Sequence, residues 1–373
     1  MRKVLIISTK IDFPIDNANK STVFNLVSSL ENVKFTVMTT KNAEKSMFNG
    51  NKNVVQDRIY PPSKNHMSFM QKICLFIRLC KKDDDIDIYH CMLEPSLFTI
   101  QILKFFISLK RKKSVITLLN KIEQPEILNQ LRFFDRIVVS SEHMKGILAK
   151  MDFKNVARIY PGVDLNKFHQ KNKDTDSFWR NKLGIGQSPV VLFAGNYNPL
   201  HGIYDIEQAI PEIIDQVPDV KIIFACRSYY KSQFMEGQKF IQRIKNSPFS
   251  ASVIFLETVE NIKELLAITD VLLFPMHKVE KKSDIPIILI EALAVKIPIV
   301  ITNIPPLNEI MKEKVGHFIP IGDSKSIAAS TIELLTDANQ KEDLGRRGRE
   351  MVERFFNSEL MARQYFEIYK EMR

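Results

Sequence analysis

The stretch between Asp270 and Thr302 decides the fold class. It reads Asp270-Val-Leu-Leu-Phe-Pro275, then a loop, then Ser283-Asp-Ile-Pro-Ile-Ile-Leu-Ile-Glu-Ala-Leu-Ala294, and finally Pro298-Ile-Val-Ile-Thr302. Two short apolar runs thus flank one apolar run of helical length. This order predicts a strand, a crossover helix and a parallel strand. We expect the helix to begin near Asp284 and to carry Glu291 two turns from its start.

The same alternation continues on both sides of this stretch. In the first half, strands are expected at 4–8, 34–39, 86–90, 114–118, 136–140 and 156–159, with a helix at 22–30. In the second half, strands are expected at 190–194, 221–225, 253–256, 271–274, 299–302 and 316–320. Runs that are apolar on both faces and separated by helices indicate parallel sheets. The predicted fold class is α/β, with two doubly wound Rossmann-like domains facing each other across a cleft.

A polar stretch from Gln170 to Ser188 separates the two sets of strands. We take it as the boundary between an N-terminal domain at 1–180 and a C-terminal domain at 188–356. The last residues, 357–373, are expected to form a helix that packs back on the N-terminal domain. Ligands of doubly wound sheets bind at the carboxyl ends of the strands, so the site is expected in the cleft between the domains.

Charge is unevenly distributed along the chain. The sequence has 53 Lys and Arg against 43 Asp and Glu, a net charge of +10. Residues 1–187 hold 31 basic and 18 acidic side chains, whereas residues 188–373 hold 22 and 25. The cationic half could face phosphate, an anionic polymer or an acidic lipid surface; a solvated, lysine-rich surface is the alternative.

Cysteine usage and hydropathy bear on the cellular compartment. The cysteines at 74, 80, 91 and 226 form no Cys-x-x-Cys pair and have no flanking histidine cluster. The pattern predicts neither a metal site nor a disulfide framework and is typical of a reducing compartment. The first apolar run is too short for a signal peptide, and the longest, at 285–307, is broken by charges and prolines. We expect a cytoplasmic protein, and a peripheral location on the inner face of the membrane is the alternative.

The segment around Asp284 has the chemistry of a nucleotide site. A helix that begins at the carboxyl end of a strand offers free N–H groups and a positive dipole to a phosphate. A carboxylate farther along the same edge, such as Glu291, can accept both hydroxyls of a ribose. The alternative is an ordinary βαβ unit with a solvated Glu291, which spacing alone favours.

Several motifs in fixed order resemble retaining glycosyltransferases of family 4, which have the GT-B fold. The helix at 283–294 resembles their Glu-x7-Glu nucleotide-sugar motif, and Tyr160-Pro-Gly-Val-Asp-Leu-Asn-Lys-Phe168 resembles the turn that ends their first domain. Gly316-His-Phe-Ile-Pro-Ile-Gly-Asp323 and the 344–355 stretch resemble their closing strand and helix. The resemblance covers 160–373 well and the first domain only by its layout.

The resemblance assigns the donor site to the C-terminal domain. Glu291 would bind the ribose, and Ser283, Ile285 and Pro286 would lie beside the phosphates or the sugar. Asp284 would replace the family's first Glu, which falls on Ser283. Asn196 and His201 stand where the family has Arg and Lys. The candidates to compensate for the two missing cations are Arg227, Lys231 and Lys278.

The first domain also departs from the family pattern. Its loop after strand one, 13–22, lacks the usual Gly-Gly, although Asn17 or Asn19 could keep the bend. Lys20 is a possible phosphate partner there, but a solvated Lys is favoured. The usual catalytic-site His falls on Leu119, and His90, expected at the end of the neighbouring strand, is the replacement candidate.

Two stretches of the first half are both basic and apolar. Contact with a membrane and packing on the sheet are equally good explanations of this pattern. The segment 69–82 places Phe69, Ile73, Phe76 and Cys80 on one helical face, and 102–109 runs into four consecutive cations. Within the family, the first domain commonly contacts the inner leaflet.

The resemblance implies an enzyme that moves a sugar from a nucleotide diphosphate donor, of UDP or GDP type, to a glycan or lipid-linked acceptor. Retention of configuration is expected, without a metal or other cofactor. The rival is a non-catalytic GT-B protein that binds a glycan or a partner glycosyltransferase. A nucleic-acid binder is disfavoured because the recognition motifs of that class are missing.

Overall fold

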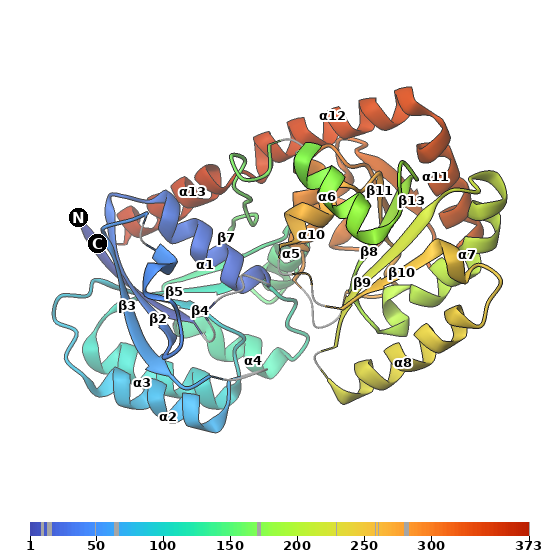
Figure 1. The fold of residues 1–373 in the computed structure, drawn as a ribbon. Coiled ribbons are helices and arrows are strands. Elements are labelled where there is room, and N and C mark those ends of the chain that lie inside the picture. Colours follow the sequence, from blue (N-terminus) through green and yellow to red (C-terminus); the bar gives the residue numbers. More distant parts are fainter. Residues whose placement is uncertain are drawn as a thin grey trace. The chain divides into compact units, whose positions relative to one another are not determined.

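The computed structural model describes residues 1–8, 11–12, 17–48, 50–62, 67–169, 173–228, 230–257, 259, 261–279 and 283–372. The chain divides into two compact units. The first comprises Met1–Asp164, Lys281–Ile287 and Phe356–Arg373, and the second comprises Leu165–Glu280 and Ile288–Phe355. Each unit is a parallel sheet with helices on both faces, which confirms the predicted fold class (Figure 1).

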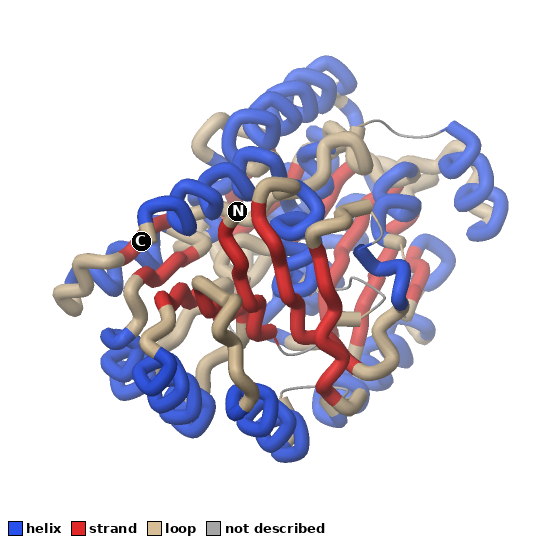
Figure 2. Tube along the Cα trace, turned by 90° about the vertical axis from the view of Figure 1, so that its left-hand side faces the viewer, coloured by secondary structure: helices blue, strands red, loops and turns tan. Residues whose placement is uncertain are grey.

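The first unit contains a seven-stranded sheet in the order β3-β2-β1-β4-β5-β6-β7. Figure 2 shows the strands of the molecule in red and the helices in blue. Its strands are β1 (Arg2–Ser8), β2 (Val33–Thr40), β3 (Val54–Tyr60), β4 (Ile88–Met92), β5 (Lys113–Leu118), β6 (Arg136–Val139) and β7 (Val156–Arg158). The sequence predicts all of these except β3. That strand carries Gln56, Asp57 and Arg58 and pairs only with β2 at the edge of the sheet, so its pattern is not a continuous apolar run.

The helices of this unit form a layer on each face of the sheet. One layer contains α2 (Phe69–Cys80), α3 (Leu97–Lys110), α4 (Pro125–Gln130) and α5 (Glu142–Lys150). The other contains α1 (Ala18–Ser29) and the C-terminal α13 (Ser358–Glu371). Short 3-10 turns are η1 (Lys45–Phe48) and η2 (Leu131–Phe133). Apolar side chains of α13, including Met361 and Tyr369, share one core with Val23 and Leu26 of α1.

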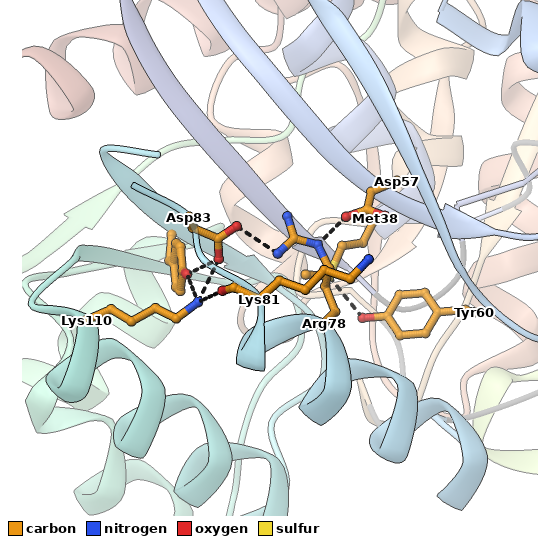
Figure 3. A network of polar contacts seen from close by, with 8 residues as sticks. Met38, Asp57, Tyr60, Arg78, Lys81, Asp83 and Lys110 are labelled. Atoms are coloured by element: carbon orange, nitrogen blue, oxygen red, sulfur yellow. Dashed lines mark hydrogen bonds and ion pairs between the residues drawn. The ribbon is translucent and has the colours of Figure 1, made fainter. Parts of the chain in front are cut away.

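A buried polar network fastens α2 and α3 to the sheet (Figure 3). Arg78 of α2 donates to Asp57 of β3 and to Asp83 at 2.8 Å. Asp83 also accepts from Lys110 of α3 at 2.9 Å and from the Tyr89 hydroxyl at 2.5 Å. These hydrogen bonds hold the pKa of Asp83 below its usual range, although burial alone would raise it. The two helix ends are therefore fixed by charged groups that water barely reaches.

The second unit contains a six-stranded parallel sheet in the order β10-β9-β8-β11-β12-β13. Its strands are β8 (Val190–Asn196), β9 (Lys221–Arg227), β10 (Val253–Leu256), β11 (Val271–Phe274), β12 (Ile299–Thr302) and β13 (Gly316–Ile319). All six are predicted from the sequence. However, β8 and β9 run two residues farther than expected, because Gly195 pairs with Cys226 and Asn196 with Arg227.

The helices of this unit are α6 (Lys173–Leu183), α7 (Ile203–Gln216), α8 (Lys231–Lys245), α9 (Ile262–Ala267), α10 (Ile287–Ala294), α11 (Ser324–Thr336) and α12 (Ala338–Phe355), with 3-10 turns η3 (Pro199–His201), η4 (Ser250–Ser252) and η5 (Leu307–Met311). Helix α6 lies within the polar stretch at 170–188. Its Trp179 is buried and donates from Nε1 to Glu264 of α9 at 3.1 Å, so this segment is part of the second unit. Among the described residues, no helix combines the length and apolarity that a membrane crossing requires.

Candidate functional site

The strand order of the second unit places its candidate site. The order reverses between β8 and β11, and ligands of doubly wound sheets bind outside the carboxyl ends of the strands at such a reversal. Asn196 is the last residue of β8, and its register partner Arg227 is the last residue of β9. Helix α10 follows β11 in the chain and carries Glu291. These three predicted side chains therefore belong to one edge of one sheet.

Glu291 is a nearly buried carboxyl with two cations close by. It is only 8% exposed, and burial raises its pKa to about 8. Lys167 and then Arg227 lower that value through their positive charges. Helix α10 begins at Ile287, so Glu291 lies one turn from its start and not two as expected. The alternative of a solvated Glu291 is wrong.

The start of α7 approaches the exit of β11 at the same edge. Its N-cap is Gly202, which has φ 77°, and a Cβ on this residue would lie 2.1 Å from the carbonyl oxygen of Pro275. Only glycine permits both the left-handed backbone and this close approach. No side chain caps α7, so the first N–H groups of this long helix point out of its start.

The structure changes what was expected of the charged and polar side chains near Asn196. His201 is only 2% exposed, so its ring does not form part of an accessible surface beside Asn196 as expected. Turn η3 lies against the segment that follows β11, where the His277 N–H donates to the Leu200 carbonyl at 2.9 Å. Lys231 and Lys278 are both exposed, and Arg227 is half-buried. The Asn196 Oδ1 atom is buried, with no hydrogen-bond partner among the described residues.

The loop before α10 belongs to the first unit. The Asp284 carboxylate is fully buried and accepts a hydrogen bond of 2.5 Å from the Ser141 hydroxyl, at the N-cap of α5. The Asp284 N–H and the Ser283 hydroxyl both donate to the carbonyl of Leu119, at 2.9 and 3.2 Å. Ile285 and Pro286 are buried as well. The helix therefore does not begin at Asp284, because this residue is held by Leu119 and Ser141.

His90 is a core residue rather than the last residue of its strand. Strand β4 continues to Met92, since Cys91 and Met92 still pair with β1. The ring is fully buried, with Nδ1 2.6 Å from the Tyr369 hydroxyl and Nε2 2.8 Å from that of Thr117. Burial lowers its pKa to about 3, so the imidazole is neutral. The expectation that His90 lines an acceptor pocket is wrong in this structure.

The start of α1 holds the remaining predicted residue. Asn17 is exposed and caps the helix by accepting from the Lys20 N–H at 3.0 Å. Lys20 is 3% exposed and its Nζ lies 2.7 Å from Asp12 Oδ1, so the solvated Lys expected here is wrong. The part of this loop at 13–16 lies outside the described residues.

Sequence reasoning missed Lys167 as a member of the candidate site. The residue sits in the turn motif at 160–168, which resembled a family signature without suggesting a charge for the donor site. Only the three-dimensional proximity to Glu291 shows its relevance.

Comparisons with known proteins find similar sequences. Residues 175–351 match the family model for glycosyl transferases group 1. The N-acetyl-alpha-D-glucosaminyl L-malate synthase of Bacillus anthracis is 26% identical over 59% of this chain and 54% of its own length. Spore coat protein SA of Bacillus subtilis is 25% identical over 58% of each. The chain thus spans only a little over half the length of these curated relatives.

Solved structures match nearly the whole chain. Anabaena HepE in complex with UDP and glucose superimposes with a TM-score of 0.80 at 15% identity, over 99% of this chain and all of that one. At this identity the likeness establishes the fold, which is that of GT-B proteins. The chain therefore carries a glycosyl transferases group 1 domain on the GT-B fold, as the motifs in its sequence indicated.

Proposed function

We propose that this protein transfers a sugar from a nucleotide diphosphate donor to a hydroxyl of a glycan or lipid-linked acceptor, with retention of configuration. The observation that carries the proposal is the buried Glu291 carboxyl with Arg227 nearby, at the edge where the sheet order of the second unit reverses. Support comes from the group 1 family match and from HepE, which was solved with UDP and glucose.

Each side chain at this edge has a role that its chemistry suits. The Glu291 carboxyl hydrogen-bonds to the two ribose hydroxyls. Arg227 faces the diphosphate as a permanent cation, and the uncapped first turn of α7 offers backbone N–H groups to a phosphate oxygen. Asn196 can donate an amide hydrogen bond but contributes no charge. Arg227 therefore carries most of the neutralisation that two cations share in the family.

The chemical step follows from charge development on the leaving group. As the bond from the sugar to the diphosphate breaks, negative charge accumulates on the diphosphate oxygens. A fixed cation and oriented N–H groups stabilise this state more than the bound substrate. Holding the acceptor hydroxyl on the same face as the departing diphosphate, whose oxygen takes up the hydroxyl proton, retains the configuration and supplies the rest of the rate enhancement. No side-chain nucleophile is needed, and none is proposed.

One observation favours a second candidate, a non-catalytic GT-B protein. Asp284, the expected replacement for the family's first Glu, is fully buried and bonded to Ser141, and Leu119 stands where the family has His. Such a protein would transfer no sugar, whether or not it binds a nucleotide at Glu291.

We further propose that the first unit contacts an anionic membrane through α2 and α3. Large apolar side chains of both helices are exposed, namely Phe69, Met70, Phe76, Ile77, Leu97, Phe98, Phe105 and Leu109. Lys72 lies over the Phe98 ring at 5.5 Å, and Lys81, Lys82 and Lys104 are exposed on the same helices or next to them. Apolar side chains interleaved with lysines suit the headgroup region of an acidic bilayer.

Donor binding is the experiment that tests the main proposal. Isothermal titration with UDP, GDP and their sugars should show binding of at least one, and Glu291→Ala should weaken it by about 1–3 kcal/mol. Glu342→Ala, at an exposed position of α12, is the matched control and should bind as the wild type does. Unchanged affinity in Glu291→Ala, with an intact fold, would contradict the site. Binding without any sugar transfer would favour the non-catalytic alternative.

A further inference from the structure

His277 and Asp205 join the segments that leave the two strands beside the order reversal of the second unit. The reversal lies between β8 and β11. Turn η3 and helix α7 follow β8, and the segment that contains His277 follows β11. The His277 Nε2 atom lies 2.5 Å from Oδ2 of Asp205, which belongs to the first turn of α7. The pair therefore spans the position at which doubly wound sheets bind their ligands.

Backbone contacts hold the pair in this position. The His277 N–H donates to the carbonyl of Leu200 in η3 at 2.9 Å. Gly202 packs so closely on Pro275 that an added Cβ would lie 2.1 Å from the Pro275 carbonyl oxygen. The Asp205 side chain is 12% exposed, whereas that of His277 is 30% exposed. The imidazole is therefore held against the start of α7 while part of it stays accessible.

The carboxylate decides which nitrogen of the imidazole carries hydrogen. An ionised carboxylate only accepts hydrogen bonds, so His277 Nε2 donates to Asp205. The other nitrogen, Nδ1, makes no hydrogen bond within the part of the chain that the structure describes. It presents a lone pair when the ring is neutral and an N–H when the ring is charged. A phosphate oxygen can accept only from the charged ring, so anion binding at Nδ1 requires a protonated imidazole.

We propose that the imidazolium of His277 binds the donor diphosphate through Nδ1, and that Asp205 is a positioning residue that orients the ring. The inference rests on the proposed function and adds a second cation to Arg227. Asn196 carries no charge and His201 is buried, so neither supplies a cation at this edge. A charged His277 also stabilises the leaving diphosphate, because negative charge grows there as its bond to the sugar breaks.

The test must separate the charge of His277 from the other groups around it. The charged and titratable groups on η3, on the first turn of α7, next to His277 in the chain, at the end of β9 and on α10 are His201, Asp205, Lys278, Arg227 and Glu291. All of them are kept in His277→Gln, which can still donate to Asp205 but carries no charge. The ratio of the dissociation constants of variant and wild type therefore cancels their titration and that of the ligand.

Isothermal titration of both proteins with UDP and GDP from about pH 6 to about pH 9 measures this ratio. At pH 6 we expect the variant to bind about 10- to 100-fold more weakly, the effect of one hydrogen bond to a charged group. The ratio should approach 1 as pH rises, because the wild type loses its imidazolium. His317→Gln is the matched control: His317 Nδ1 lies 3.7 Å from the Glu333 carboxylate, but on the edge strand β13. It should bind as the wild type does at every pH.

Two results of this titration would overturn the inference. One is a ratio of 1 at every pH, which leaves the donor site standing without His277. The other is a loss of affinity that is equal at every pH, which would mean that His277 acts only through the structure of its segment.

Inorganic pyrophosphate and nitrogen-15 spectra of the histidine rings distinguish this inference from the proposed function. The His277 signals, identified by their loss in His277→Gln, should show hydrogen on Nε2 at about pH 9 and an imidazolium when pyrophosphate is bound at about pH 7. A neutral ring with hydrogen on Nδ1 would overturn the inference. If the wild type binds neither nucleotide, the donor function fails and pyrophosphate decides: binding that depends on His277 supports the inference, and no binding overturns it as well.

Discussion

His90 shows how strongly burial controls chemistry at the scale of a single residue. It is neutral in the fold, where burial lowers its pKa to about 3, whereas the unfolded chain protonates it near pH 6.5. The unfolded state therefore binds the extra proton as pH falls below 6.5, and the folded state gains none until about 3. We expect the free energy of unfolding to fall by up to about 1.4 kcal/mol per pH unit across this window.

Urea unfolding of the wild type and His90→Gln between pH 4 and 7 measures this effect. The variant keeps a side chain that hydrogen-bonds to Tyr369 or Thr117 but does not titrate, so its pH slope should be smaller by the contribution of one proton. Glu291 changes stability in the opposite direction above pH 4.5, and it is present in both proteins, so its contribution cancels. Parallel pH profiles would show that His90 is protonated inside the fold.

Some residues of the candidate site are predictable from the sequence, and others are not. Glu291, Asn196 and Arg227 were predicted because each lies at a strand end or on the helix after a strand, and parallel sheets bring such positions to one edge. His201 and Asp284 were misjudged because their burial depends on segments far away in the chain. Asp284, for example, is covered by contacts with Leu119 and Ser141.

A glycine is essential in a helix where another segment approaches its backbone closely, and it is dispensable where none does. Gly345→Ala in α12 would place a methyl group 2.4 Å from a backbone oxygen, so we expect a loss of at least about 1–3 kcal/mol, as overpacking costs. Gly146 of α5 has nothing within 4 Å of an added Cβ. Gly146→Ala should therefore stabilise the fold by about 0.5–1 kcal/mol, the difference in helix propensity.

Chemical denaturation of the two alanine variants decides this comparison. The substitutions are chemically identical and both lie in helices, so any difference in sign comes from the surroundings. Equal effects would mean that α12 does not approach α10 as closely as the structure shows.

The network around Asp83 predicts that two aspartates of one loop, Asp83 and Asp85, contribute unequally to the free energy of unfolding. Asp83→Ala leaves Arg78 and Lys110 with fewer partners in a largely buried place, so we expect a loss of about 3–5 kcal/mol. Asp85 pairs with Lys3 on the surface, with a side chain that is 71% exposed. Asp85→Ala should therefore cost less than about 1 kcal/mol. Denaturant midpoints of the two variants give the comparison, and similar losses would contradict the burial of the network.

Elements were predictable where apolar runs are continuous and missed where they are not. The strands with two neighbours, such as β1 and β11, are almost entirely buried, and their sequences show it directly. Edge strand β3 and polar helix α6 lack such runs, because one side of each faces water. Packing on α9 locates α6, with a hydrogen bond from Trp179 to Glu264, and no local pattern predicts this packing.

At the scale of the whole molecule, charge and exposed apolar surface coincide in the first unit. The cationic half of the sequence contains α2 and α3, whose exposed apolar side chains include Ile77 and Phe105. Ionic attraction would bring this surface to an acidic bilayer, and insertion of the apolar side chains would hold it there. The two contributions differ in their dependence on salt, since screening weakens only the first.

Flotation with vesicles separates these contributions. Binding to vesicles that contain phosphatidylglycerol should exceed binding to pure phosphatidylcholine and should fall as salt rises from about 0.05 to about 0.5 M, because the screening length shortens to a few ångströms. Ile77→Glu with Phe105→Glu should weaken binding by at least about 100-fold, since burying each side chain contributes about 1.5–3 kcal/mol. Phe234→Glu in α8 is the matched control, because Phe234 and Ile77 are both 57% exposed and only Ile77 lies on the proposed surface. Equal losses from the two sets of substitutions would show that general hydrophobicity, and not the α2–α3 surface, drives binding, and the absence of flotation with either vesicle would refute membrane contact.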